Sequence, residues 1–120
     1  MAIKDKISDM NAFIKHITAP ELKEMIDRGE KLQLIDAREK VDYEIYHIDG
    51  AIWIHRKELL EKADLLSRDI PVIIYCKYGM KSPPAIKTLS TEKNFTNLYS
   101  LREGLYDWMK LYDRDALELL

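Results

Sequence analysis

The sequence predicts one α/β domain with a mostly parallel sheet of about five strands and helices on both faces. Short apolar runs suited to buried strands recur at 32–36, 51–54 and 71–75. Segments with helical spacing of apolar residues separate these runs, and strands that alternate with helices form parallel sheets covered on both sides. A chain of 120 residues with 47% hydrophobic residues can build a single hydrophobic core.

The first half of the chain carries a helix signal followed by strand signals. Thr18 and Glu21 have the spacing of a capping box, and apolar residues then recur at helical intervals until Gly29 ends the pattern. The run at 32–36 (LQLID) is apolar and ends in an acid, which is typical of a buried strand that opens into a loop. The other elements expected here are a short helix over 40–46, a turn at Asp49 and Gly50, and a strand over 51–54.

The second half contains the strongest strand signal, at 71–75 (PVIIY). Its first residue is a proline that can begin a strand, and β-branched residues follow. Cys76 is therefore expected at the C-terminal end of a buried strand. Pro83 and Pro84 fit the first turn of a helix, where the amides have no intrahelical partner. The remaining expected elements are helices over 59–66, 82–89 and 105–112 and a short strand at 98–99.

Charge and composition exclude several classes of partner. The 19 basic and 21 acidic residues leave no electrostatic footprint for a nucleic acid. We find no apolar segment of membrane-helix length and no secretory leader in residues 1–10, so we expect a cytoplasmic protein without a membrane partner. One cysteine excludes an internal disulfide, and the scattered histidines, including His47 and His55, lack the spacing of a zinc site.

Residues 76–82 (CKYGMKS) carry the candidate chemistry. In open α/β sheets, ligands bind at the carboxyl ends of strands, where the next helix offers free amides and the positive end of its dipole. A thiol at that position faces an anion site, which favours the thiolate, and Lys77 and Lys81 would add positive charge if they turn inward. We therefore expect Cys76 to be a nucleophile at neutral pH.

Four motifs, in order, resemble the family of single-domain rhodanese-like (thiosulfate sulfurtransferase) proteins over about residues 16–108. They are a D-x-R motif at 36–38, a stretch like G-H-I-x-G-A at 46–51, the loop with Cys76, Gly79, Lys81 and Ser82, and a closing segment at 101–108 that keeps Gly104 and Trp108. The resemblance implies a rhodanese-like domain over 16–112, an N-terminal extension over 1–15 and a C-terminal tail over 113–120.

The sequence departs from the family pattern at three positions. Tyr46 and Glu103 stand where the family has glycine, so we expect local differences in backbone geometry there. Lys81 stands where many members have arginine, which replaces a planar bidentate donor by a point charge.

The resemblance implies that the chain is an enzyme that transfers sulfur in two steps. The Cys76 thiolate would take a sulfane sulfur from a small sulfur-containing anion such as thiosulfate and hold it as a persulfide for a thiol, a protein thiol included, or cyanide. It implies no cofactor and no metal. The substrate would contact the loop residues Lys77, Tyr78, Gly79, Met80, Lys81 and Ser82. Arg38 is expected either to contact the substrate or to pair structurally with Asp36 or a helix end.

Two other interpretations stay open. The loop of a non-catalytic module could bind a partner, because fold does not dictate function. A cysteine phosphatase or arsenate reductase on the same fold resembles this chain, but it typically has the pattern C-x-x-x-x-x-R, and Ser82 occupies the position of that arginine. The sequence assigns no oligomeric state.

Overall fold

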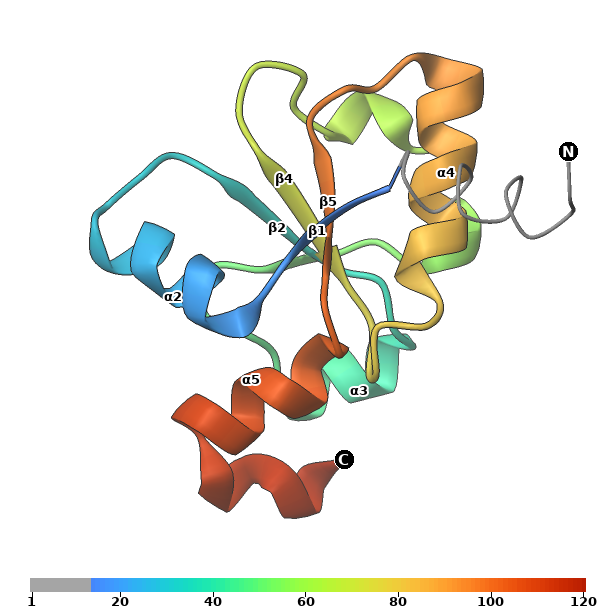
Figure 1. The fold of residues 1–120 in the computed structure, drawn as a ribbon. Helices are drawn as coiled ribbons and strands as arrows, with labels where there is room; N and C mark the ends of the chain where they lie inside the picture. Colours follow the sequence, from blue (N-terminus) through green and yellow to red (C-terminus); the bar gives the residue numbers. More distant parts are fainter. Residues whose placement is uncertain (1–13) are drawn as a thin grey trace, which may run out of the picture.

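The computed structural model describes residues 14–120, and its strands form one five-stranded sheet in which every pairing is parallel (Figure 1). The strands are β1 (Lys15–Ile17), β2 (Gln33–Asp36), β3 (Ile52–Trp53), β4 (Val72–Tyr75) and β5 (Leu98–Leu101). Their spatial order is β1-β5-β4-β2-β3, so β4 is the central strand. The predicted parallel sheet is confirmed, and the segment after β4 leaves the sheet from its middle.

Helices cover both faces of the sheet, as predicted. The helices are α2 (Ala19–Asp27), α3 (Lys40–Ile45), α4 (Ser82–Lys93) and α5 (Gly104–Tyr112), with 3-10 helices η1 (Arg56–Glu58), η2 (Ala63–Leu65) and η3 (Arg114–Leu119). In Figure 1, α2 and α5 lie on one side of the sheet and α4 lies on the other. Two hydrophobic cores result, one between the sheet and α2 and α5, and one between the sheet and α4.

The side chains of β4 enter both cores. Ile73 and Tyr75 belong to the core under α2 and α5, whereas Val72 and Ile74 belong to the core under α4. All four side chains are fully buried. A strand that is covered on both faces has no solvent side, and this explains why its sequence is continuously apolar.

The capping box predicted at the first helix is confirmed. The Thr18 hydroxyl accepts a hydrogen bond from the Glu21 amide at 3.2 Å, and the Glu21 carboxylate accepts one from the Thr18 amide at 2.9 Å. Strand β1 directly precedes this cap and pairs with β5. Residues 1–13 of the predicted N-terminal extension lie outside the described residues.

The prediction of a helix over 59–66 is wrong. The chain instead makes the short 3-10 helices η1 and η2, with hydrogen bonds mostly between residues three apart. The apolar side chains that predicted the helix still point inward, because Leu59, Ala63 and Leu66 are buried in the core under α4. The same spacing therefore buries the same residues in two separate turns, and tertiary packing decides the backbone form.

The C-terminal residues pack against the body of the domain. Ala116 of η3 is buried, and the Tyr46 hydroxyl donates a hydrogen bond to Asp113 at 2.9 Å. Burial and this bond to Asp113 raise the pKa of Tyr46 to about 12. The backbone of Tyr46 is extended (φ −159°), so tyrosine is accommodated there without the conformational freedom of glycine. The division into extension, domain and tail remains a prediction.

Glu103 adopts a left-handed backbone conformation (φ +60°). We expect Glu103→Gly to stabilise the protein by about 0.5–1 kcal/mol, because it relieves a left-handed strain that exceeds the added chain entropy of glycine. Urea unfolding measures the change. Glu92→Gly, on the exposed face of α4, is the control and should destabilise by about 1 kcal/mol. A loss of stability in Glu103→Gly would show that the side chain outweighs the strain.

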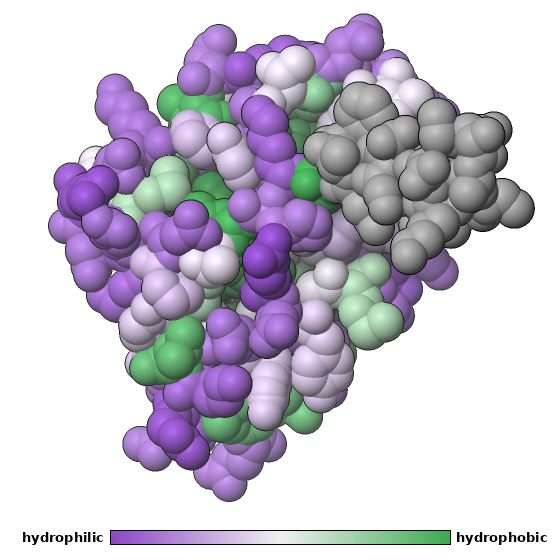
Figure 2. All heavy atoms as spheres, in the orientation of Figure 1, coloured by the Kyte–Doolittle hydropathy of each residue, from purple (hydrophilic) through white to green (hydrophobic). Residues whose placement is uncertain are grey.

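Polar side chains cover most of the face shown in Figure 2, and the apolar side chains lie in small separate groups. Within residues 14–120, no helix has the length and apolar character needed to cross a membrane.

Candidate active site around Cys76

Cys76 lies directly after β4 and opens a loop that leads into α4. Cys76 is 4% exposed, and it borders a pocket of about 330 Å³ at the carboxyl ends of the strands. The predicted loop residues Lys77, Tyr78, Met80 and Lys81 line this pocket together with Arg38. A reactant can therefore reach the thiol through the pocket.

The backbone of the loop curls around the sulfur. The Lys81 amide donates a hydrogen bond to Cys76 Sγ at 3.3 Å. Among residues 14–120, the amides of 77–80 have no protein acceptor. Successive unpaired amides in a tight turn form an anion-binding concavity. The loop thus offers hydrogen-bond donors both to the sulfur and to an anion beside it.

Two glycines hold this loop against the start of α5. The Leu105 and Tyr106 amides donate hydrogen bonds to the Cys76 and Lys77 carbonyls at 2.9 and 3.0 Å. Gly79 (φ +80°) and Gly104 (φ +62°) face this contact, and a Cβ on either would lie 2.7 Å or less from the backbone of the other segment. The first turn of α5 therefore serves as the base of the loop, and its free amides find partners there.

Two buried serines continue from the sulfur into the core. Ser82 Oγ lies 3.6 Å from Cys76 Sγ and 2.8 Å from Ser100 Oγ, and both serines are fully buried. Ser82 is the acceptor available to the Ser100 hydroxyl among the described residues. When Ser100 donates to Ser82, the Ser82 hydrogen points to the sulfur, and this arrangement satisfies both hydroxyls. No sequence pattern indicated Ser100, because β5 has the pattern of an ordinary buried strand.

We expect Ser100→Ala to slow alkylation of Cys76 by iodoacetamide about fivefold, the equivalent of about 1 kcal/mol for one hydrogen bond. Without Ser100, the Ser82 hydroxyl is free to turn away from the sulfur. The rate is measured at neutral pH. Ser90→Ala, on α4 away from the pocket, is the matched control. Equal rates for Ser100→Ala and wild type would contradict the assigned direction of the hydroxyls.

The Arg38 guanidinium is bound within the fold. It forms an ion pair with the fully buried Asp36 at 2.8 Å and also donates to the carbonyls of Asp42 and Tyr46. Burial acts to lower the pKa of Arg38, but the hydrogen bonds and charge of Asp36 outweigh it and raise that pKa. Of the two roles expected for Arg38, these contacts supply the structural pair, although the side chain also borders the pocket.

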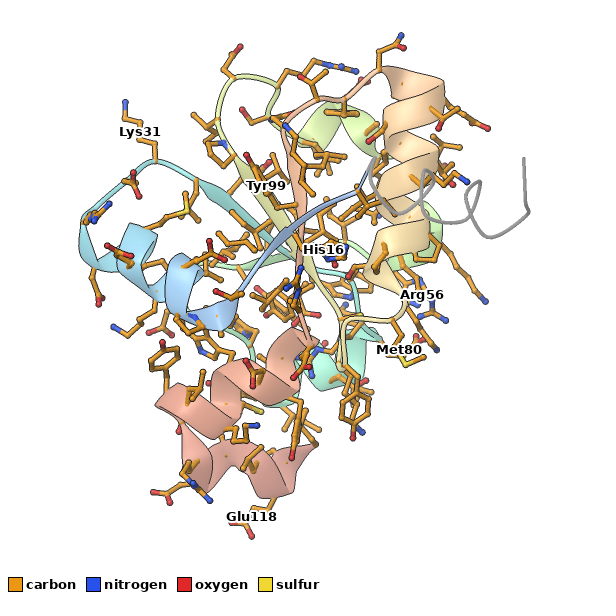
Figure 3. The ribbon with its side chains drawn as sticks, viewed as in Figure 1. His16, Lys31, Arg56, Met80, Tyr99 and Glu118 are labelled. Carbon is orange, nitrogen blue, oxygen red and sulfur yellow. The ribbon has the colours of Figure 1, made fainter. Side chains whose placement is uncertain are left out.

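The pocket also contains charged residues that the sequence analysis did not single out. Glu39, Asp42 and Arg56 line it from segments outside the loop. In Figure 3, Arg56 and Met80, which both line this pocket, lie in the same region near the lower end of α4. The position of Arg56, three residues after the end of β3, could have indicated it, since the carboxyl ends of neighbouring parallel strands share one edge of the sheet.

The two histidines considered as metal ligands have local partners. His47 Nδ1 lies 2.8 Å from the Tyr43 carbonyl, and its ring stacks on that of Tyr43. His55 Nδ1 accepts from the Lys57 amide, and its Nε2 lies 2.9 Å from Glu39. In the part of the chain that the structure describes, no three His, Cys, Asp or Glu side chains gather as metal ligands.

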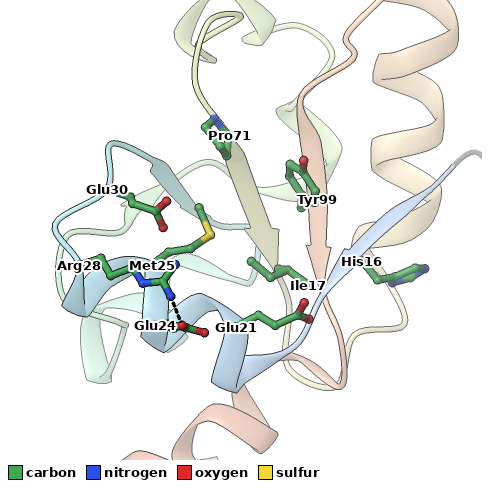
Figure 4. A pocket seen from close by; sticks show the side chains of 9 residues that line it. All are labelled: His16, Ile17, Glu21, Glu24, Met25, Arg28, Glu30, Pro71 and Tyr99. Atoms are coloured by element: carbon green, nitrogen blue, oxygen red, sulfur yellow. Dashed lines mark hydrogen bonds and ion pairs between the residues drawn. The ribbon is translucent and has the colours of Figure 1, made fainter.

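A second pocket of similar volume lies beside α2, away from Cys76 (Figure 4). Glu21, Glu24, Arg28 and Glu30 contribute its charges, and His16 also lines it. Glu21 is engaged in the helix cap, and Glu24 pairs with Arg28. The chain's sole cysteine is not among the residues that line this pocket, so the pocket offers no nucleophile comparable to the Cys76 thiol.

Comparison with known proteins matches nearly the same part of the chain as the family resemblance in the sequence. The family model described as "Rhodanese-like domain" matches residues 18–111. A rhodanese-related protein from Thermoplasma volcanium has a similar structure, with a TM-score of 0.72 and 28% sequence identity over 82% of this chain and 93% of that chain.

Curated relatives carry sulfurtransferase and sulfur-carrier names. The probable adenylyltransferase/sulfurtransferase MoeZ of Mycobacterium tuberculosis is 35% identical over 104 residues, which are 84% of this chain and 26% of MoeZ. The putative sulfur carrier protein YrkF of Bacillus subtilis is 29% identical over 84% of this chain and 54% of YrkF. The chain therefore spans about a quarter of the length of MoeZ and about half of the length of YrkF. The thiosulfate sulfurtransferase GlpE of Shewanella oneidensis is 29% identical over 82% of this chain and 95% of GlpE.

Proposed function

Because the chain belongs to the rhodanese-like domain family, we propose that it is a sulfurtransferase that carries a sulfane sulfur as a persulfide on Cys76. The observation that carries this proposal is the placement of the chain's sole thiol at the base of a pocket, under a loop with unpaired amides. These amides favour an anionic sulfur and an anionic donor in the same space.

In the first step, the Cys76 thiolate attacks the outer sulfur of thiosulfate. A new S–S bond forms to Cys76 as the S–S bond of thiosulfate breaks, and sulfite leaves with the bonding electron pair. The persulfide keeps one negative charge. The amides of 77–82 and the side chains of Lys77 and Lys81 are proposed to hold the donor and the persulfide, with Arg38 at the border of the pocket.

In the second step, a thiophilic acceptor takes the outer sulfur. Cyanide attacks it and leaves as thiocyanate, and the electron pair of the broken S–S bond returns to Cys76 as the thiolate. A thiol acceptor, including one on a protein, would leave as a persulfide in the same way. Neither step requires a metal or a cofactor. The physiological donor, the acceptor and a cytoplasmic location belong to this proposal.

Mass spectrometry of the intact protein tests the proposal. Incubation with thiosulfate should add one sulfur atom, about 32 Da, and later addition of cyanide should remove it. If thiosulfate, mercaptopyruvate and a low-molecular-weight persulfide all leave the mass unchanged, the proposal fails and a non-catalytic binding module takes its place.

The same sample also tests the phosphatase alternative. An aryl phosphate should not be hydrolysed above background, because Ser82 stands where a phosphatase loop has its arginine clamp. Hydrolysis by wild type but not by Cys76→Ser would favour the phosphatase instead.

A further inference from the structure

We propose that Arg56 binds the anionic end of the sulfur donor from the wall of the pocket opposite the Cys76 loop. This inference rests on the proposed function and adds to it a residue outside the Cys76 loop that would hold the oxyanion of the donor. Thiosulfate, with a sulfonate, and mercaptopyruvate, with a carboxylate, both carry such an oxyanion close to the sulfur that is transferred.

The backbone fixes where the Arg56 side chain starts. The Arg56 amide donates a hydrogen bond to the Ala37 carbonyl at 3.1 Å, just after β2. His55 precedes it as the cap of η1 and accepts from the Lys57 amide. Because β2 lies next to β4 in the sheet, this anchor places Arg56 across the pocket from the loop.

Neighbouring side chains orient the guanidinium. The Arg56 side chain is 23% exposed, and its Nη1 lies 3.3 Å from His55 Nε2 and 3.6 Å from the Glu39 carboxylate. Since His55 Nδ1 accepts from an amide, the proton of the neutral ring is on Nε2, which donates to Glu39 at 2.9 Å. This hydrogen bond is the main reason that the pKa of the Glu39 carboxyl is lowered. Glu39 is thus a fixed anchor beside Arg56, and the planar guanidinium keeps further donors for a ligand.

The charges of the pocket favour an anion. Four cationic side chains and two carboxylates line it, although the whole protein has a net charge of −2. The four cations are not equivalent. Arg38 is committed to the buried Asp36, and Lys77 lies over the ring of Tyr78 at 5.2 Å. Arg56 is the lining guanidinium whose paired carboxylate is exposed, so its bidentate donors can serve a ligand.

Alkylation of Cys76 tests this site without relying on sulfur transfer. Iodoacetate and iodoacetamide react by the same chemistry and have nearly the same size, but iodoacetate carries a carboxylate. Each reagent modifies the sole thiol of the chain. The ratio of the two rates therefore reports how strongly the pocket attracts an oxyanion beside the sulfur.

We expect Arg56→Ala and the larger Arg56→Gln to lower the ratio of iodoacetate rate to iodoacetamide rate about tenfold, the effect of losing one charge-assisted contact. The iodoacetamide rate should stay unchanged. The KM for thiosulfate should rise by a similar factor with little change in kcat. Arg28→Ala is the matched control, because Arg28 is also paired with an exposed glutamate, Glu24, but lies beside α2 (Figure 4).

An unchanged ratio in both Arg56 variants, or an equal fall in both alkylation rates, would overturn the inference. A changed ratio in Arg28→Ala would do the same, because the effect would then be one of overall charge. If wild type takes up no sulfur but the ratio falls in the Arg56 variants, the oxyanion site stands and the sulfurtransferase proposal alone fails.

Discussion

Replacing Cys76 with serine is expected to abolish sulfur uptake from thiosulfate completely. The persulfide forms on a thiolate, the chain has one cysteine, and a serine hydroxyl is not an equivalent nucleophile towards sulfane sulfur. Wild type should gain about 32 Da on incubation with thiosulfate, and Cys76→Ser should gain nothing. Thiocyanate formation from thiosulfate and cyanide should fall to the uncatalysed rate.

The variant should remain folded. Serine is nearly isosteric with cysteine, and at this position it can bond to the Ser82 hydroxyl and to the Lys81 amide that now contact the sulfur. Far-UV circular dichroism and thermal unfolding provide the control. Sulfur transferred by a folded Cys76→Ser protein would remove Cys76 from the mechanism.

Gly104→Ala is expected to have the largest effect on stability, at least about 3 kcal/mol. Its Cβ would lie 2.4 Å from the Cys76 carbonyl oxygen and 2.7 Å from the Gly79 nitrogen, and backbone atoms cannot turn aside as a flexible side chain can. The left-handed conformation (φ +62°) adds its own strain. Because the displaced segment is the loop over Cys76, sulfur uptake should fall together with stability.

Gly50→Ala separates the two causes of that loss. Gly50 also has a positive φ (+87°), but no atom lies within 4 Å of the added Cβ. This variant should therefore lose about 1 to 2 kcal/mol from the backbone conformation alone and keep its sulfur uptake. Urea unfolding compares the two variants, and a similar loss in both would mean that the loop does not lie as close to α5 as the structure places it.

Much of the fold could be predicted because its determinants are local. The capping box at Thr18 and the continuous apolar run of β4 lead directly to the elements observed. The apolar residues at 59–66 did not decide between one helix and two turns, because both arrangements bury them. Strand β1 has only three residues, and its parallel pairing with β5 brings together positions from opposite ends of the chain.

The site could be predicted only in part, for a related reason. Cys76 and its loop form one continuous segment, so their placement after a strand and before a helix is visible in the sequence. Arg56 and Glu39 line the same pocket from other segments, and Ser100 contacts Ser82 from β5. The sequence position of Arg56 indicates only the edge of the sheet at which it lies, and no local pattern records which side chains meet there. The motif that contains Arg38 was evident in the sequence. Whether its side chain turns towards Asp36 or towards the substrate was not, and the structure shows the pair with Asp36.

The burial of the sole thiol beside a small pocket also provides a way to measure the number of active sites in a preparation. The chain has no second cysteine that could accept the sulfur. In the proposed reaction the persulfide on the buried Cys76 therefore persists until an external acceptor reacts with it. Without an acceptor, each competent chain should release a single sulfite and then stop. The sulfite released in that first turnover would measure the fraction of a preparation whose sites are assembled, independently of how fast any acceptor reacts.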